Sequence, residues 1–177
     1  EAVNDETFGK LFPTWIFEDY TLEGSVGVFG DTVLRASFYS ESHVDELLIQ
    51  IADREWFYSQ HPDLELNTII YRGTENQIYI DGGDYVVRYS CIVSMKNNSD
   101  FLKMVNSAAC FQEQGESLVW FGDKLIKTGD LSETTLQWLD WYNGLSEEEQ
   151  LAISAIPADL LEASGISNAE DTEATSE

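Results

Sequence analysis

Asp and Glu are the most numerous side chains in this sequence that could take part in catalysis or metal binding. The 177 residues include 33 Asp and Glu against 9 Lys and Arg. Pairs of acids stand adjacent or nearly adjacent at Glu18 and Asp19, Asp45 and Glu46, and Asp53 and Glu55. Two carboxylates can hydrolyse a glycosidic bond when an apolar pocket separates their pKa values. No such pocket can be inferred around these pairs, so a small carboxylate-dependent hydrolase is kept as an alternative and a non-catalytic protein is expected.

Two histidines and one glycine turn are the other candidates for metal binding. His43 and His61 fall in predicted loops, where solvated histidines are expected. Residues 81–84 read Asp-Gly-Gly-Asp, which supplies two oxygen ligands, whereas a calcium loop alternates many more. We interpret this run as a hairpin turn. The sequence has no serine nucleophile elbow and no phosphate-binding glycine loop, and it therefore predicts no catalytic residue, no metal site and no cofactor.

Cys91 and Cys110 are the two cysteines, and they allow two interpretations. A disulfide between them would close a loop of about 19 residues, worth roughly 3 kcal/mol in the chain-entropy model. Such a bond requires an oxidising compartment. Two buried thiols are the other interpretation. No CxxC pair or Cys/His spacing supports a zinc site.

Alternating apolar residues predict an antiparallel sheet in the first half of the chain. Residues 20–29 and 33–39 form a predicted hairpin, and Leu34, Ala36 and Phe38 share one face of its second strand. Further strands are predicted over residues 47–52, 68–71, 77–80 and 85–93. The glycines at 82 and 83 supply the positive φ angle of the last turn.

One helix is predicted to cover this sheet. Asn98 can cap a helix, and the apolar residues that follow it have helical spacing: Phe101, Leu102, Val105, Ala108 and Ala109. An antiparallel meander of strands with one covering helix is an α+β fold. We assign this domain to residues 8–112.

A smaller acidic extension follows, over residues 113–163. A hairpin is predicted over residues 117–127, and a helix over residues 133–143 begins at Ser132 and ends at Gly144.

A second helix of the extension begins at a capping box formed by Ser146 and Glu149. One more helical turn is predicted over residues 158–162. Residues 164–177 are expected to be a disordered acidic tail.

The first helix of the extension carries an aromatic stripe. Trp138, Trp141, Tyr142 and Leu145 share one side of it. The stripe allows two interpretations: it docks the helix onto the sheet domain, or it forms a protein-binding patch, since aromatic residues dominate interface hot spots. An acidic rim around an aromatic patch would suit a basic partner.

Negative charge is concentrated behind Lys127, which is followed by 12 acids and no Lys or Arg. The formal net charge is −24 and the pI is near 4.1. This charge argues against binding of nucleic-acid phosphates and of an anionic membrane surface. No stretch approaches the ~20 apolar residues of a membrane span. We therefore expect a basic protein partner, no direct nucleic-acid binding and no membrane insertion of this segment.

Residues 12–23 read FPTWIFEDYTLE. This segment resembles the opening of an uncharacterised domain on the outer side of anti-sigma-factor-like membrane proteins and lipoproteins of Gram-positive bacteria. Residues 77–109 resemble the aromatic-rich hairpin and final helix of that domain. Residues 135–145 also resemble an extension seen in related gut-bacterial proteins. The resemblance covers residues 8–112 and implies a sensing or interaction module outside the membrane, without catalytic residues.

Two main hypotheses of function follow. The first is a non-catalytic extracytoplasmic interaction or sensor module of a bacterial surface protein. Because the chain begins at Glu1 and not at Met, we expect an upstream targeting segment to be missing. The second is a cytoplasmic acidic inhibitor that mimics nucleic acid with its carboxylates.

Overall fold

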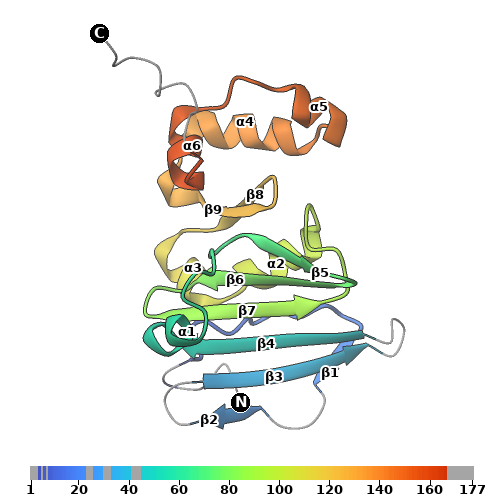
Figure 1. Cartoon of the computed structure of the whole chain (residues 1–177), viewed down its shortest axis with the longest axis vertical. Coiled ribbons are helices and arrows are strands. Elements are labelled where there is room, and N and C mark those ends of the chain that lie inside the picture. Colours follow the sequence, from blue (N-terminus) through green and yellow to red (C-terminus); the bar gives the residue numbers. More distant parts are fainter. Residues whose placement is uncertain are drawn as a thin grey trace.

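The computed structural model describes residues 4, 6, 8–22, 26–29, 33–40 and 45–166. One antiparallel sheet dominates the first half of the chain (Figure 1). Its seven strands are β1 (Tyr20–Leu22), β2 (Gly27–Phe29), β3 (Val33–Ser40), β4 (Asp45–Asp53), β5 (Ile69–Arg72), β6 (Glu75–Asp81) and β7 (Tyr85–Cys91). Together with the helices described below, this sheet confirms the predicted α+β class.

The strand order differs from a simple meander. The strands lie in the order β1-β3-β4-β7-β6-β5, and β2 also pairs with β3. After β4 the chain therefore crosses to the far edge of the sheet, forms β5 and β6, and returns as β7 beside β4. Leu48 lies opposite Ser90, and Asp53 lies opposite Tyr85. This is a Greek-key connection, which depends on long-range pairing and is invisible in local sequence patterns.

Helix α1 (Arg54–Gln60) makes this crossover. In the sequence, this stretch is marked only by the aromatic residues Trp56, Phe57 and Tyr58, and aromatic residues favour strands. The helix forms because the Asp53 carboxylate caps it, accepting a hydrogen bond from the Trp56 N–H at 2.9 Å. Phe57 is buried against Ala52, Tyr79 and other residues of one sheet face.

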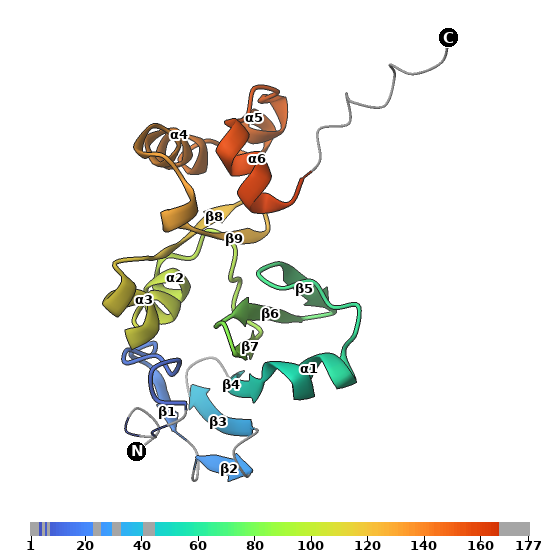
Figure 2. The same cartoon turned by 90° about the vertical axis from the view of Figure 1, so that its left-hand side faces the viewer.

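Two short helices, α2 (Ser99–Asn106) and α3 (Ala109–Gln114), cover the other face of the sheet. Figure 2 shows them on the side of the sheet opposite α1. Asn98 caps α2 as predicted, accepting from the N–H groups of Asp100 and Phe101. The predicted single helix is divided at Ser107, whose carbonyl accepts from Thr14 Oγ1 at 2.7 Å. The N-terminal segment therefore binds the chain at the break between α2 and α3, through this hydrogen bond from Thr14.

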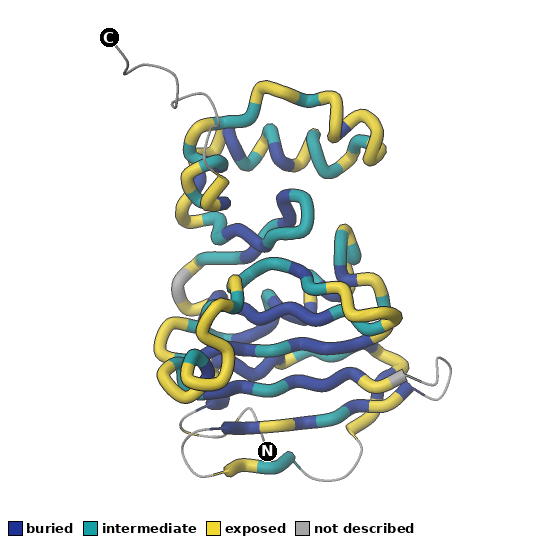
Figure 3. Tube along the Cα trace, in the orientation of Figure 1, coloured by how far each residue is buried: buried dark blue, intermediate teal, exposed yellow. Residues whose placement is uncertain are grey.

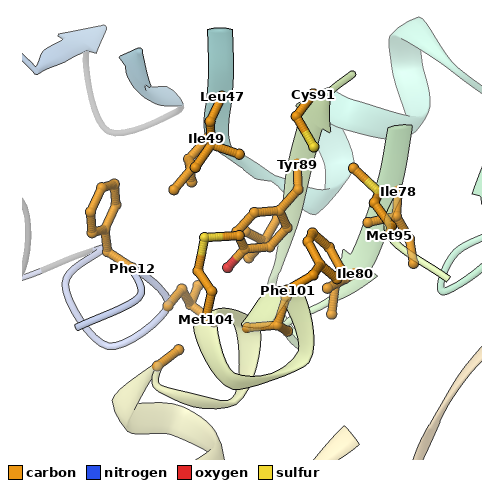
Figure 4. Packing of buried hydrophobic residues seen from close by; sticks show 14 of the residues in the cluster. Phe12, Leu47, Ile49, Ile78, Ile80, Tyr89, Cys91, Met95, Phe101 and Met104 are labelled. Carbon is orange, nitrogen blue, oxygen red and sulfur yellow. The ribbon is translucent and has the colours of Figure 1, made fainter. Parts of the chain in front are cut away.

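The main core lies between the sheet and α2. Figure 4 shows Tyr89 between residues of β4, β6 and α2. Its ring meets Phe101 edge-on at 5.7 Å between centroids. Phe12, from the N-terminal segment, packs on Phe38 at 6.3 Å. In Figure 3 the buried stretches run along the central strands and continue into the hairpin beyond them.

That hairpin, β8 (Leu118–Phe121) and β9 (Lys124–Lys127), is buried on both faces. Leu118, Trp120 and Leu125 belong to the main core, whereas Phe121 and Ile126 pack against the C-terminal helices. The alternation of side chains along a strand produces this division. The main core therefore does not end at the boundary between residues 112 and 113 that the sequence suggested.

The hairpin is a separate two-stranded sheet that an isolated bridge between Thr68 and Lys124 joins to the chain just before β5. The Leu125 N–H donates to the Asn67 carbonyl at 2.8 Å, and the Ile69 N–H donates to the Asp123 carbonyl at 2.9 Å. A 3₁₀ turn, η2 (Thr128–Asp130), leads from β9 to the C-terminal helices.

Three helices complete the chain: α4 (Glu133–Asn143), α5 (Glu147–Ala152) and α6 (Ala158–Ser164). The structure confirms the α4 boundaries, the Ser132 cap and the capping box of Ser146 with Glu149. The start of the predicted tail differs, because Ser164 is the last residue of α6 and its carbonyl accepts from Lys124 Nζ at 2.8 Å. Residues 167–177 lie outside the described residues.

Candidate functional site

The aromatic stripe lies along one flank of α4, beside the surface by which α4 docks. Trp138 and Tyr142 stack on each other with ring centroids 4.9 Å apart and planes 14° apart. Both rings also contact Phe121 of β8, at 6.4 and 5.6 Å between centroids. Two members of the stripe therefore help to dock the helix. They dock it on the β8–β9 hairpin and not on the seven-stranded sheet.

Trp141 is the member of the stripe that faces solvent. It is 49% exposed, and its ring centroid lies 5.9 Å from that of Trp138. Leu145, which is half-buried, continues the stripe beyond the end of α4. We call Trp138, Trp141, Tyr142 and Leu145 the aromatic patch. An exposed indole beside half-buried aromatic rings is typical of an interface anchor.

Asp159 of α6 binds residues at the start of α4 and so holds α4 in position. Its carboxylate accepts from Thr135 Oγ1 at 2.6 Å and from the Ser132 N–H at 2.9 Å. These hydrogen bonds lower the pKa of Asp159 to about 2. The carboxylate is thus ionised at neutral pH and joins two helices of the extension.

The fold brings lysines from earlier elements to the acidic extension. Lys96, between β7 and α2, lies 3.2 Å from Asp123 and 3.5 Å from Glu147. Burial lowers the pKa of Lys96, but the hydrogen bonds and charges of Asp123 and Glu147 outweigh it, so that the pKa is raised. The absence of Lys and Arg after residue 127 in the sequence is therefore partly offset in three dimensions, on the side of α5 that meets Lys96.

A cleft separates the other flank of α4 from α2. Its volume is about 420 Å³. It is lined by the side chains and loops of three elements: residues 97–99 and Leu102 at α2, Val119 and Trp120 of β8, and Leu136, Leu139, Asp140 and Asn143 of α4. Sequence analysis missed this site. The spacing of Leu136, Asp140 and Asn143 places them on one side of a helix, but nothing local indicates that α2 lies opposite.

The paired carboxylates whose side chains the structure describes, which leaves out Asp45, are used structurally or lie on the surface. Asp19 accepts from Ser40 Oγ at 3.1 Å, and Asp53 caps α1. Glu18 and Glu55 are exposed. Among the described carboxyl groups, those with a clear pKa shift have it lowered: Glu65, Glu75, Asp81, Glu149 and Asp159. A general acid would require the opposite shift.

The two metal candidates have other roles where they are described. His61 ends α1, with its ring 5.1 Å from that of Phe57, and His43 lies outside the described residues. Asp81 binds Arg54 Nη1 at 2.7 Å and accepts from the Gly83 N–H, and Gly83 has a φ of +83°. This is turn chemistry, as predicted. No group of three metal-binding side chains occurs in the described part of the chain.

The structure holds Cys91 and Cys110 as thiols and does not join them in a disulfide. Cys91 is buried in the main core, and its Sγ lies 3.6 Å from the Val93 carbonyl. Cys110 is half-buried, and burial raises its pKa. Both interpretations of the cysteines stay predictions for the protein in its native compartment.

The chain matches no protein-family model, no curated protein and no solved structure in the three comparisons. The resemblance of residues 8–112 to an extracytoplasmic domain family therefore stays a prediction. Within the residues described above, no helix has the length and apolar character needed to cross a bilayer.

Proposed function

We propose that this chain is a non-catalytic interaction or sensor module that acts outside the cytoplasm, as part of a Gram-positive bacterial surface protein. The observation that carries the interaction role is the aromatic patch, in which solvent-facing Trp141 contacts Trp138 of the half-buried stack of Trp138 and Tyr142. The resemblance of residues 8–112 supports the location.

Charge supports a basic protein as the partner. Glu147, Glu148 and Glu149 open the helix that follows Leu145 of the patch. Lys96 contacts Glu147, whereas Glu148 and Glu149 are exposed. A basic surface would meet apolar area at Trp141 and opposite charge around it, which favours both affinity and rapid association.

The experiment compares three immobilised forms of the full chain: wild type, Trp141→Ala and Trp56→Ala. Trp56 is the matched control, because it is 38% exposed on α1, away from the patch. Each form is exposed to the cell-surface fraction of the source organism. A basic protein should be retained by wild type and Trp56→Ala, lost with Trp141→Ala, and released when salt shortens the Debye length. Equal retention by all three forms would remove the patch as the binding site.

The acidic inhibitor remains the alternative, supported by the net charge of −24. A nucleic-acid enzyme as the retained protein, released by added duplex DNA, would favour that alternative. Proteolysis of intact cells separates the two locations, since only a protein outside the membrane is cleaved by added protease.

A further inference from the structure

The two flanks of α4 offer two different surfaces. With 3.6 residues per turn, Leu136, Asp140 and Asn143 lie roughly half a turn away from the aromatic patch. Leu139, between the two flanks, is buried against the hairpin. The cleft between α4 and α2 is therefore a separate feature from the patch, although both depend on the same helix.

The cleft has the size and lining of a small-molecule site. Ligand pockets commonly measure about 300–1,000 Å³ and combine apolar walls with a few polar groups, and this cleft measures about 420 Å³. Four aliphatic side chains supply the apolar walls: Leu102, Val119, Leu136 and Leu139. Trp120, 3% exposed, lines the wall formed by β8.

The polar groups at the cleft differ in whether they already have partners. Asn98 is occupied as the cap of α2 and donates to the Ser94 carbonyl. Asn143 donates its Nδ2 hydrogen to the Trp120 carbonyl at 2.8 Å, which leaves its side-chain oxygen as an acceptor. Asp140 is exposed and forms no ion pair with any described residue.

The charge of the lining selects the ligand. Asp140 contributes a carboxylate, and no Lys, Arg or His lines the cleft within the described residues. The N-terminus of α2 does not favour an anion, because its Asp100 and Phe101 N–H groups already donate to the Asn98 side chain. A cation is therefore favoured at the rim, and an apolar group inside.

We propose that the cleft between α2 and α4 binds a small organic cation, an amine or ammonium group attached to an apolar body. The apolar body lies against Leu102, Val119 and Leu136. The ammonium group donates to the Asp140 carboxylate and to the Asn143 side-chain oxygen. This ligand site goes beyond the proposed protein-binding function and does not depend on it.

Three probes of similar size and different charge test the proposal: 2-phenylethylamine, 2-phenylethanol and phenylacetate. Each is titrated into the full ¹⁵N-labelled chain, and NMR follows the Trp120 indole and Asn143 amide signals. The amine should shift these signals at the lowest concentration, and phenylacetate at the highest. Asp140→Asn should weaken amine binding about two- to fivefold, as expected for an exposed ion pair, and leave binding of the alcohol unchanged.

A variant with the opposite charge at residue 140 tests the proposal through a gain of binding and not only through a loss. Asp140→Lys, an exposed substitution, should make phenylacetate bind better than the amine. Trp141→Ala should leave amine binding intact, so failure of the patch and failure of the cleft are distinguishable. The proposal is overturned if the three probes bind equally, if the amine shifts signals away from the cleft, or if Asp140→Asn has no effect on the amine.

Discussion

Trp138 and Tyr142 lie one turn apart on α4 and stack with their ring planes 14° apart. Their contacts with Phe121 make this stack part of the core between α4 and the β8–β9 hairpin. The stack therefore serves stability, whereas Trp141 beside it is left for solvent or for a partner. Two tryptophans three residues apart thus have different roles.

Substitution separates these roles. Trp138→Ala should lower the free energy of unfolding by about 1–3 kcal/mol, somewhat less than for a fully buried tryptophan. Trp141→Ala should change it by less than about 1 kcal/mol. Urea unfolding monitored by circular dichroism measures both. Equal destabilisation by the two variants would contradict this division.

Residues 1–116 should not fold as an independent domain. This fragment lacks Leu118, Trp120 and Leu125, which fill the main core beside Phe101. Removal of one buried tryptophan alone typically costs about 3–5 kcal/mol, a large part of the stability of a small domain. The fragment should give a poorly dispersed NMR spectrum, whereas residues 1–166 should give a dispersed one. A cooperatively folded fragment would instead support a boundary near residue 112.

Stability should fall in acid partly through Asp159. Its pKa of about 2 in the folded protein lies below the usual ~3.9 of an aspartate. The resulting stability is present above pH ~4 and is lost as the pH falls through about 2. Asp159→Asn should therefore be less stable than wild type at pH 7, and the difference in urea midpoint should shrink towards pH 2. A difference that stays constant with pH would contradict an ionised Asp159 as the cause.

The Asn98 cap of α2 should make a measurable contribution to the free energy of unfolding. Asn98→Ala removes the acceptor of the Asp100 and Phe101 N–H groups and should cost about 0.5–2 kcal/mol. Asn98→Asp keeps a capping oxygen and is the matched control. Hydrogen exchange of the first turn of α2 should accelerate in the alanine variant and stay slow in the aspartate variant.

The two thiols should differ in reactivity. Cys110 is half-buried with a raised pKa, so a thiol reagent should modify it slowly at neutral pH and faster as the pH rises. Cys91 is 2% exposed and should react on unfolding. Mass spectrometry after alkylation counts both groups. Protein recovered from its native compartment with neither thiol reactive after unfolding would show that they are bridged there.

Local patterns predicted much of the secondary structure. The cap at Ser132 and the apolar spacing behind it placed α4 at its observed boundaries, and the two glycines after Asp81 placed the β6–β7 turn. These features depend on interactions among residues close in sequence. Helix α1 was missed because its aromatic residues favour strands locally, and its helical state depends on the Asp53 cap and on the burial of Phe57 against the sheet.

The sequence by itself determined the α+β class, the acidic C-terminal segment and the aromatic stripe, because composition and periodicity carry that information. Tertiary structure alone decided that β7 returns to β4, that the β8–β9 hairpin is buried on both faces, and that Lys96 reaches Glu147. It also decided which flank of α4 faces α2 across a cleft. Each of these depends on contacts between residues far apart in the chain, and such contacts leave no periodic trace in one sequence.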